Sequence, residues 1–146
     1  MITPSPTTKI DPTLARGTLA ARIPASGTRP ELVSLAVPNS SYEMYLRPVI
    51  ALDAAPGAKL IGTISVQARR IDVVQTGGKF VEPVAGRPRR VQGRVVGVRG
   101  SAVVVDAGMP VHLIPTDPAQ KADGFEAGSI VACDVLDGAT FAPQSA

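Results

Sequence analysis

The sequence predicts an all-β fold, and three observations support this prediction. Short runs rich in Val, Ile, Leu and Thr are separated by Gly, Pro, Asn and Asp, as strands joined by turns are. Helical periodicity is almost absent from the chain. The order of the runs in the first half of the chain recurs in the second half. We therefore expect two repeats of one small β unit, each with four strands.

The repeats are expected at residues 16–74 and 91–143. The strands expected in the first repeat are 17–23, 31–37, 42–48 and 59–74, and those in the second are 91–98, 102–106, 111–114 and 129–135. Residues 1–15 are rich in Pro and Thr and are predicted to form a disordered arm. Only residues 53–58 and 118–125 suit a helical turn, because Asp117 and Pro118 fit the start of the second one.

Matching features within the two halves are the basis for the repeat. Each half has a strand that ends in Leu-x-Pro, at Pro48 and at Pro115, and each then has a crossover that leads to Gly57 or Gly128 and a last strand. A unit of roughly 55 residues cannot bury enough apolar area to be stable alone. Two units can instead close one barrel or pack as two small barrels. With only 3% aromatic residues, narrow barrels filled by aliphatic side chains are favoured.

Residues 75–90 are predicted to form a linker between the repeats. This segment contains Gly77, Gly78, Pro83, Gly86 and Pro88, so it is too rich in Pro for a central strand.

The second half resembles OB-type small barrels. Residues 92–96 (Gln-Gly-Arg-Val-Val), a Val-rich strand, a crossover and residues 127–133 (Ala-Gly-Ser-Ile-Val-Ala-Cys) follow the layout of S1-like nucleic-acid-binding barrels and of oxyanion-binding Mop barrels. The resemblance covers about 50 residues and implies an OB-like barrel that binds a polyanion or a small oxyanion. Together with the repeat, it predicts a duplicated small OB-like β-barrel. The exposed aromatic residues that S1-like barrels use for base stacking are missing from the matching strands.

The charge of the chain is distributed unevenly. Residues 1–100 hold 14 Lys or Arg and 6 Asp or Glu, whereas residues 101–146 hold one Lys and 6 Asp or Glu. Such asymmetry suits a polyanionic partner, and it also suits an oligomer in which a basic face docks on an acidic one. The positive charge is densest between residues 69 and 99, and its members are Arg69, Arg70, Lys79, Arg87, Arg89, Arg90, Arg94 and Arg99.

These eight residues are the predicted contacts for nucleic acid or another anion. Arginines on a Pro-braced loop present planar donors to phosphate oxygens, and such contacts give affinity without reading the base sequence. We therefore expect a non-catalytic protein that binds single-stranded DNA or RNA. Stacking would come from Tyr42, Tyr45 or Phe80, although Tyr42 and Tyr45 lie three residues apart and cannot share a strand face.

Two alternatives stay open. The same arginines can hold Asp or Glu of another subunit, which predicts a structural protein that forms a homo-oligomer. The third hypothesis is an oxyanion-binding barrel, as the Mop resemblance implies.

Catalytic, metal and cofactor sites are not expected. The chain has one His and one Cys, so a site with two His residues, an internal disulfide and a cysteine-based zinc site are all excluded. Asp106-Ala107-Gly108 resembles the active-site turn of aspartic proteases but has Ala in place of the hydroxyl residue, and it suits a hairpin turn. No run of about 18 apolar residues is present, and the N-terminus lacks the features of a signal peptide. We therefore expect a cytoplasmic protein without a membrane partner.

Overall fold

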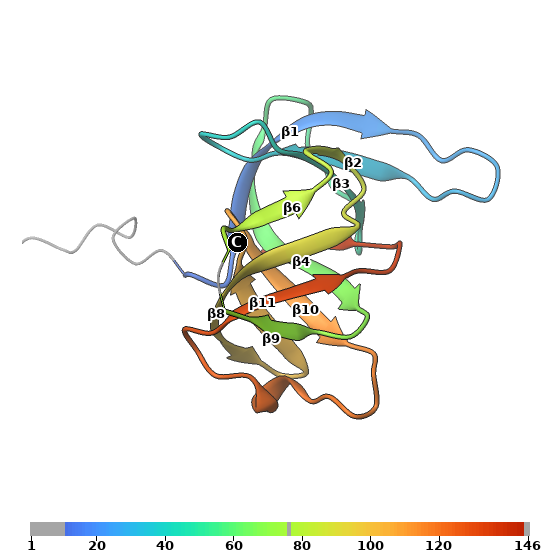
Figure 1. Cartoon of the computed structure of the whole chain (residues 1–146). Coiled ribbons are helices and arrows are strands. Elements are labelled where there is room, and N and C mark those ends of the chain that lie inside the picture. The colour runs from blue at the N-terminus through green and yellow to red at the C-terminus, as the bar shows by residue number, and fades with distance from the viewer. Residues whose placement is uncertain (1–10, 76, 145–146) are drawn as a thin grey trace, which may run out of the picture.

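The computed structural model describes residues 11–75 and 77–144, and it confirms the all-β prediction (Figure 1). The strands of the first half are β1 (Ala15–Ile23), β2 (Leu32–Ala36), β3 (Glu43–Pro48), β4 (Lys59–Ala68) and β5 (Asp72–Val74). They are followed by β6 (Phe80–Glu82), β7 (Ala85–Gly86), β8 (Arg90–Arg99), β9 (Ala102–Asp106), β10 (Pro110–Pro115), β11 (Ile130–Asp134) and β12 (Thr140–Pro143). A 3-10 turn, η2 (Ala122–Gly124), precedes β11. None of the helices in the described part of the chain could cross a membrane.

Five strands form a closed barrel in the order β1-β2-β3-β12-β4. The pairing of β1 with β4 closes it, since Ala15 lies opposite Gly62 and Thr18 opposite Lys59. All neighbours in this barrel are antiparallel except β3 and β12, which are parallel. Its interior holds Leu19, Leu46, Ile64 and Phe141, each fully buried. The C-terminal strand β12 therefore completes a barrel whose other strands come from the first half of the chain.

A second ring of strands shares β4 with this barrel. The C-terminal end of β4 pairs in parallel with β10, and the sheet continues through β9 and β8 to β11. The end of β11 returns to the end of β4 at an isolated bridge between Ala68 and Val135. Beside this bridge the Arg69 N–H donates to the Asp134 carbonyl at 2.9 Å, and the Leu136 N–H donates to the Gln67 carbonyl at 2.8 Å. The two rings lie one above the other in Figure 1.

The shared strand β4 explains why both rings have one continuous core. Alternate residues of β4 are buried, namely Gly62, Ile64, Val66 and Ala68. Gly62 and Ile64 lie beside β12, which carries Phe141, whereas Val66 and Ala68 lie beside β10. Gly62 is required at this position because an added Cβ would overlap the carbonyl oxygen of Ala142. The alternation expected for a half-buried strand therefore extends across both rings.

The segment expected to be a linker contacts both rings. Its strand β6 pairs with β8, and its strand β7 pairs with β3. The Glu43 N–H donates to the Val84 carbonyl at 2.9 Å, and the Val81 N–H donates to the Tyr42 hydroxyl at 3.3 Å. Residues 77–90 thus form a strap that holds the first barrel against the second ring.

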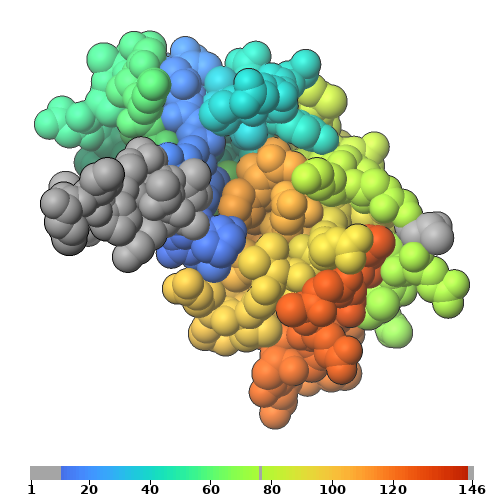
Figure 2. Space-filling view, turned by 90° about the vertical axis from the view of Figure 1, so that its left-hand side faces the viewer, coloured from blue at the N-terminus to red at the C-terminus, as the bar shows by residue number. Residues whose placement is uncertain are grey.

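The expected N-terminal arm lies partly outside the described residues, because residues 1–10 are not among them. Residues 11–14 are folded and lie against the second ring, where the His112 Nε2 atom is 2.8 Å from the Thr13 carbonyl oxygen. The blue start of the described chain contacts yellow and orange segments of the second half (Figure 2).

Candidate nucleic-acid interface

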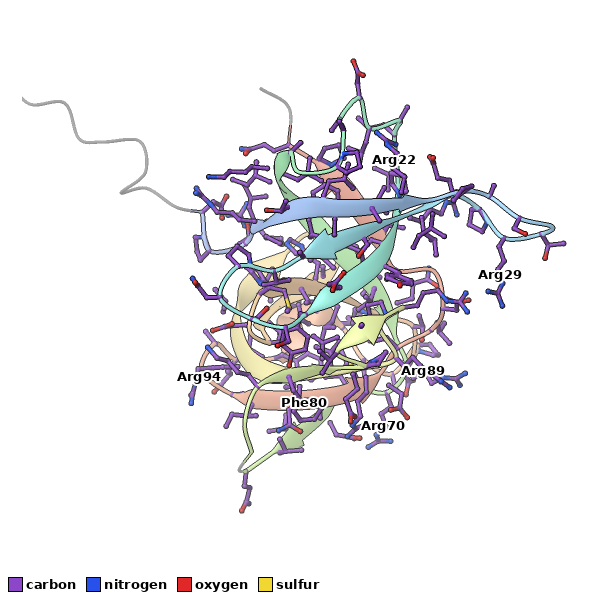
Figure 3. All side chains as sticks on the ribbon, turned by 90° about the horizontal axis from the view of Figure 1, so that it is seen from above. Arg22, Arg29, Arg70, Phe80, Arg89 and Arg94 are labelled. Atoms are coloured by element: carbon purple, nitrogen blue, oxygen red, sulfur yellow. The ribbon has the colours of Figure 1, made fainter. Side chains whose placement is uncertain are left out.

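The eight predicted basic residues fall on two different parts of the surface. Arg69 and Arg70 directly follow β4, Arg87 and Arg89 belong to the strap and its end, and Arg90 begins β8. The other three, Lys79, Arg94 and Arg99, lie before β6 or further along β8. Arg70 and Arg89 lie toward one side of the molecule and Arg94 on the opposite side (Figure 3). The structure therefore brings five of the eight together and separates the remaining three from them.

Three adjoining hollows mark the surface around the first group. The first, of about 550 Å³, is lined by Arg69, Arg87 and Arg89 with Pro83, Pro88, Val135, Leu136 and Asp137. The second, of about 610 Å³, shares Arg69 and Arg89 with the first and adds Glu82, Arg90 and Asp134. The third, of about 240 Å³, shares Arg87 and Asp137 with the first and adds Arg29, Pro30, Leu32, Tyr45, Arg47, Gly138 and Ala139. Because neighbouring hollows share lining residues, they adjoin one another on one surface.

We call this surface the arginine groove and define it by six residues: Arg29, Arg47, Arg69, Arg87, Arg89 and Arg90. Its arginines come from the β1–β2 loop, β3, the residue after β4, the strap and the start of β8, so both rings contribute. Arg70 lies beside the groove and is not among its lining residues.

Backbone hydrogen bonds fix the middle of the groove. The Arg89 N–H donates to the Glu82 carbonyl at 2.8 Å, and the Arg89 carbonyl accepts the Val135 N–H at 2.9 Å. Arg69 is held by the bond from its N–H to the Asp134 carbonyl. The backbones of Arg69 and Arg89 are therefore held by the end of β11 and the residue after it, while the side chains of both arginines are exposed.

Carboxylates of the same chain pair with several of the predicted residues. Arg87 Nη1 lies 2.8 Å from Asp137 Oδ2, and Arg90 Nη1 lies 2.8 Å from Asp134 Oδ1. Arg70 pairs with Asp72 at 3.1 Å, Lys79 with Asp106 at 3.3 Å and Arg99 with Asp11 at 3.7 Å. Arg69 and Arg89 form no ion pair with any residue that the structure describes. Exposed ion pairs stabilise a fold by only about 0–1 kcal/mol, so phosphate oxygens can replace these carboxylates.

The remaining predicted residues occupy other environments. Lys79 and Arg94 line a separate hollow of about 320 Å³ with Asp106 and three glycines, and Arg94 Nη1 donates to the Gly128 carbonyl at 2.7 Å. Arg99 lies beside the N-terminal turn through its pairing with Asp11.

Sequence reasoning missed two groove residues, Arg29 and Arg47. Both lie outside the densest basic segment, and in the predicted repeat Arg47 is only the middle residue of the Leu-x-Pro motif that ends at Pro48. The alternation of Tyr45, Leu46 and Arg47 is the pattern that predicts a surface position for Arg47. Leu46 is fully buried, so its two neighbours in the strand must point outward.

Of the three aromatic candidates, Tyr45 alone lines the groove. It is half-buried and belongs to the third hollow. Tyr42 packs against the core and accepts the Val81 N–H through its hydroxyl. Phe80 is half-buried on β6, where it lies opposite Gln92 of β8.

The side chains weighed as catalytic candidates are buried or hydrogen-bonded. His112 is buried, with its Nε2 bonded to the Thr13 carbonyl. Burial raises the pKa of the Cys133 thiol to about 12, so it is not a thiolate near neutral pH. Asp106 accepts the Gly108 N–H at 3.0 Å, as the predicted turn requires. Within residues 11–75 and 77–144, no three His, Cys, Asp or Glu side chains form a cluster suited to a metal ion.

Comparisons with protein-family models, with curated proteins and with solved structures found no match to this chain.

Proposed function

We propose that this protein binds single-stranded nucleic acid without sequence preference and without catalysis, and that the arginine groove is its binding surface. The observation that carries the proposal is the lining of the groove, in which six arginines lie beside only three carboxylates, those of Glu82, Asp134 and Asp137. An excess of guanidinium groups attracts phosphates, and the planar N–H donors of each guanidinium group match phosphate oxygens. Release of counterions from the nucleic acid would then favour binding.

Tyr45 at one end of the groove supports a single-stranded partner. An aromatic ring beside phosphate-binding arginines can stack on a base that is not held in a duplex. Since stacking does not depend on base identity, the groove suits DNA or RNA of any sequence.

We also propose that the two halves are copies of one OB-like unit. Turns at corresponding positions support this: the Gly57 N–H donates to the Leu19 carbonyl at 2.7 Å, and the Gly128 N–H donates to the Val95 carbonyl at 2.8 Å. The return bonds also correspond, from the Leu19 N–H to Ala58 and from the Val95 N–H to Ser129, each at 2.8 Å. The register of β1 shifts after Leu19 and that of β8 shifts after Val95.

In this proposal the two copies have exchanged their last strands. β12 lies parallel to β3 and antiparallel to β4, and the end of β4 lies parallel to β10 and antiparallel to Val135. The bond from the Val49 N–H to the Phe141 carbonyl, at 3.0 Å, corresponds to the bond from the Thr116 N–H to the Ala68 carbonyl, at 3.1 Å. Each half then supplies the fifth strand of the other half's barrel.

The OB-like interpretation agrees with the position of the groove. OB-type barrels bind oligonucleotides on the face of their second and third strands and on the loops between strands one and two and between strands four and five. In the first barrel these are β2 and β3, the β1–β2 loop and the segment before β12. The third hollow is lined from these parts by Arg29, Pro30, Leu32, Tyr45, Arg47, Gly138 and Ala139.

A homo-oligomer is the second candidate function, favoured by one exposed sheet edge. The strand order ends at β5, where the side chain of Val73 is 64% exposed. An unpaired edge with an exposed Val can pair with a second copy. Light scattering of the full chain tests this candidate, since a particle larger than one chain supports assembly and a monomer at all concentrations contradicts it.

Fluorescence anisotropy with a labelled oligothymidylate at low salt tests the proposed binding. We expect Arg69→Ala with Arg89→Ala to weaken binding about tenfold or more, because charged hydrogen bonds are lost. The matched control is Arg94→Ala with Arg99→Ala, which removes the same charge outside the groove and should change affinity much less. Absence of binding by the unmodified chain, or equal losses in the two double variants, would overturn the proposal.

A further inference from the structure

Residues 134–139, from the last residue of β11 to the residue before β12, follow the arginine groove with a carboxylate near each end. Members of this segment line all three hollows, with Asp134 in the second, Val135 in the first and second, and Asp137 in the first and third. Hydrogen bonds of residues 134–136 to Gln67, Arg69 and Arg89 hold its backbone in place. The segment is therefore a fixed wall of the groove.

Both carboxylates of this wall are bound to groove arginines. Asp137 pairs with Arg87 and Asp134 pairs with Arg90, each at 2.8 Å. A carboxylate presents to a guanidinium group the same kind of charged oxygen acceptors as a phosphate does. The side chains of Asp137 and Asp134 are 66% and 63% exposed, so water reaches both ion pairs and their exchange is easy.

We infer that Asp134 and Asp137 compete with phosphate for Arg87 and Arg90, so that nucleic acid enters the groove by displacing these two carboxylates. This inference rests on the proposed function, because it concerns how the same groove is occupied in the absence of ligand. Two of the six groove arginines are paired with carboxylates within the free chain, while Arg69 and Arg89 form no ion pair in the described part of it. Binding then begins at Arg69 and Arg89 and extends to Arg87 and Arg90 as phosphates replace the carboxylates.

The experiment measures oligothymidylate affinity for Asp134→Asn, Asp137→Asn and the double variant of the full chain. Asn keeps the shape of Asp and removes its charge. We expect each single variant to bind about threefold tighter, in line with the strength of exposed ion pairs, and the double variant to bind about tenfold tighter.

Asp72→Asn is the matched control. It also frees an exposed arginine, Arg70, and makes the same change in net charge, but neither residue lines the groove. We expect it to change affinity less than twofold. Equal tightening by Asp72→Asn and by the groove variants would show a general effect of charge and would overturn the inference.

A double-mutant cycle gives a second measurement that does not depend on one variant. Arg87→Ala should weaken binding only slightly in the unmodified chain and several-fold more in the Asp137→Asn background, since Arg87 is free only in the second case. Equal losses in both backgrounds would contradict competition by Asp137. If Arg69→Ala with Arg89→Ala still weakens binding, the proposed function stands although this inference fails.

Discussion

At the scale of single residues, Tyr45 tests whether the proposed binding surface contacts bases as well as phosphates. Tyr45→Ala should weaken binding of an oligothymidylate about five- to 150-fold, because base stacking on an aromatic ring contributes about 1–3 kcal/mol. Tyr45→Phe keeps the ring and should retain most of the affinity. Anisotropy titrations against oligothymidylate and against an abasic strand of the same length measure the effect, since an abasic strand should not distinguish the variants.

Tyr42→Phe is a suitable control for this prediction. It removes the hydroxyl that accepts the Val81 N–H and leaves the groove lining unchanged. If Tyr42→Phe and Tyr45→Ala weaken binding equally, or if the abasic strand binds as tightly as the normal one, Tyr45 does not stack on bases.

The environment of the Asp11 carboxylate predicts that the stability of the fold depends on pH. Hydrogen bonds from the hydroxyl and the backbone N–H of Thr13, at 2.6 and 2.8 Å, lower the pKa of Asp11 from its usual value of 3.8. Because the pKa of Asp11 is lower in the folded chain than in the unfolded chain, the ionised carboxylate stabilises the fold above pH 3.8. This stabilisation is lost as the pH falls through the pKa that Asp11 has in the folded chain. Asp11→Asn should therefore lower Tm at pH 7 more than at pH 2.5, as thermal unfolding followed by circular dichroism would show. An equal change at both pH values would contradict this role of the Asp11 carboxylate.

The chemistry of the candidate residues was predictable from the sequence, whereas their grouping was not. The density of arginines between residues 69 and 99 is visible without coordinates, and five of these eight basic residues do lie near one another. Arg94 and Arg99 lie elsewhere because the ten-residue strand β8 leads away from the strap, and Lys79 precedes β6 and lines a separate hollow with Arg94. Arg29 and Arg47 join the groove only through tertiary packing.

At the scale of elements, β12 is the strand on which the closed barrel depends. Phe141 is fully buried and lies opposite Ile64 on β4 and Pro48 on β3. Phe141→Ala should lower the free energy of unfolding by about 3–5 kcal/mol through lost burial and the remaining cavity. Urea denaturation measures this quantity. Loss of less than about 1 kcal/mol would mean that β12 does not complete the barrel.

The strands expected from the sequence exist, except that the single strand expected at 59–74 is divided into β4 and β5, and β6, β7 and β12 were not predicted. These three are short, and their partners are distant in the chain: β6 pairs with β8, β7 with β3, and β12 with β3 and β4. Short strands of this kind are determined by their partners more than by local propensity. Of the two helical turns, residues 118–125 contain η2, whereas residues 53–58 contain no helical turn.

At the scale of the whole molecule, sharing β4 makes the two rings interdependent. One cluster of buried residues includes Leu19 and Phe141 of the first barrel and Val105 and Val131 of the second ring. We therefore expect a single cooperative unfolding transition, with coincident curves from calorimetry and circular dichroism. Two separate transitions would show that residues 16–74 and 91–143 fold as independent domains.

The central claim is that nucleic acid contacts the arginine groove, and an amide NMR titration with oligothymidylate tests it most directly. The account predicts that the largest shifts occur at the groove residues Arg29, Tyr45, Arg47, Arg69, Arg87, Arg89 and Arg90. Resonances near Lys79, Arg94 and Arg99 should change little. Absence of shifts at low salt, or the largest shifts around Arg94 and Arg99, would contradict the account.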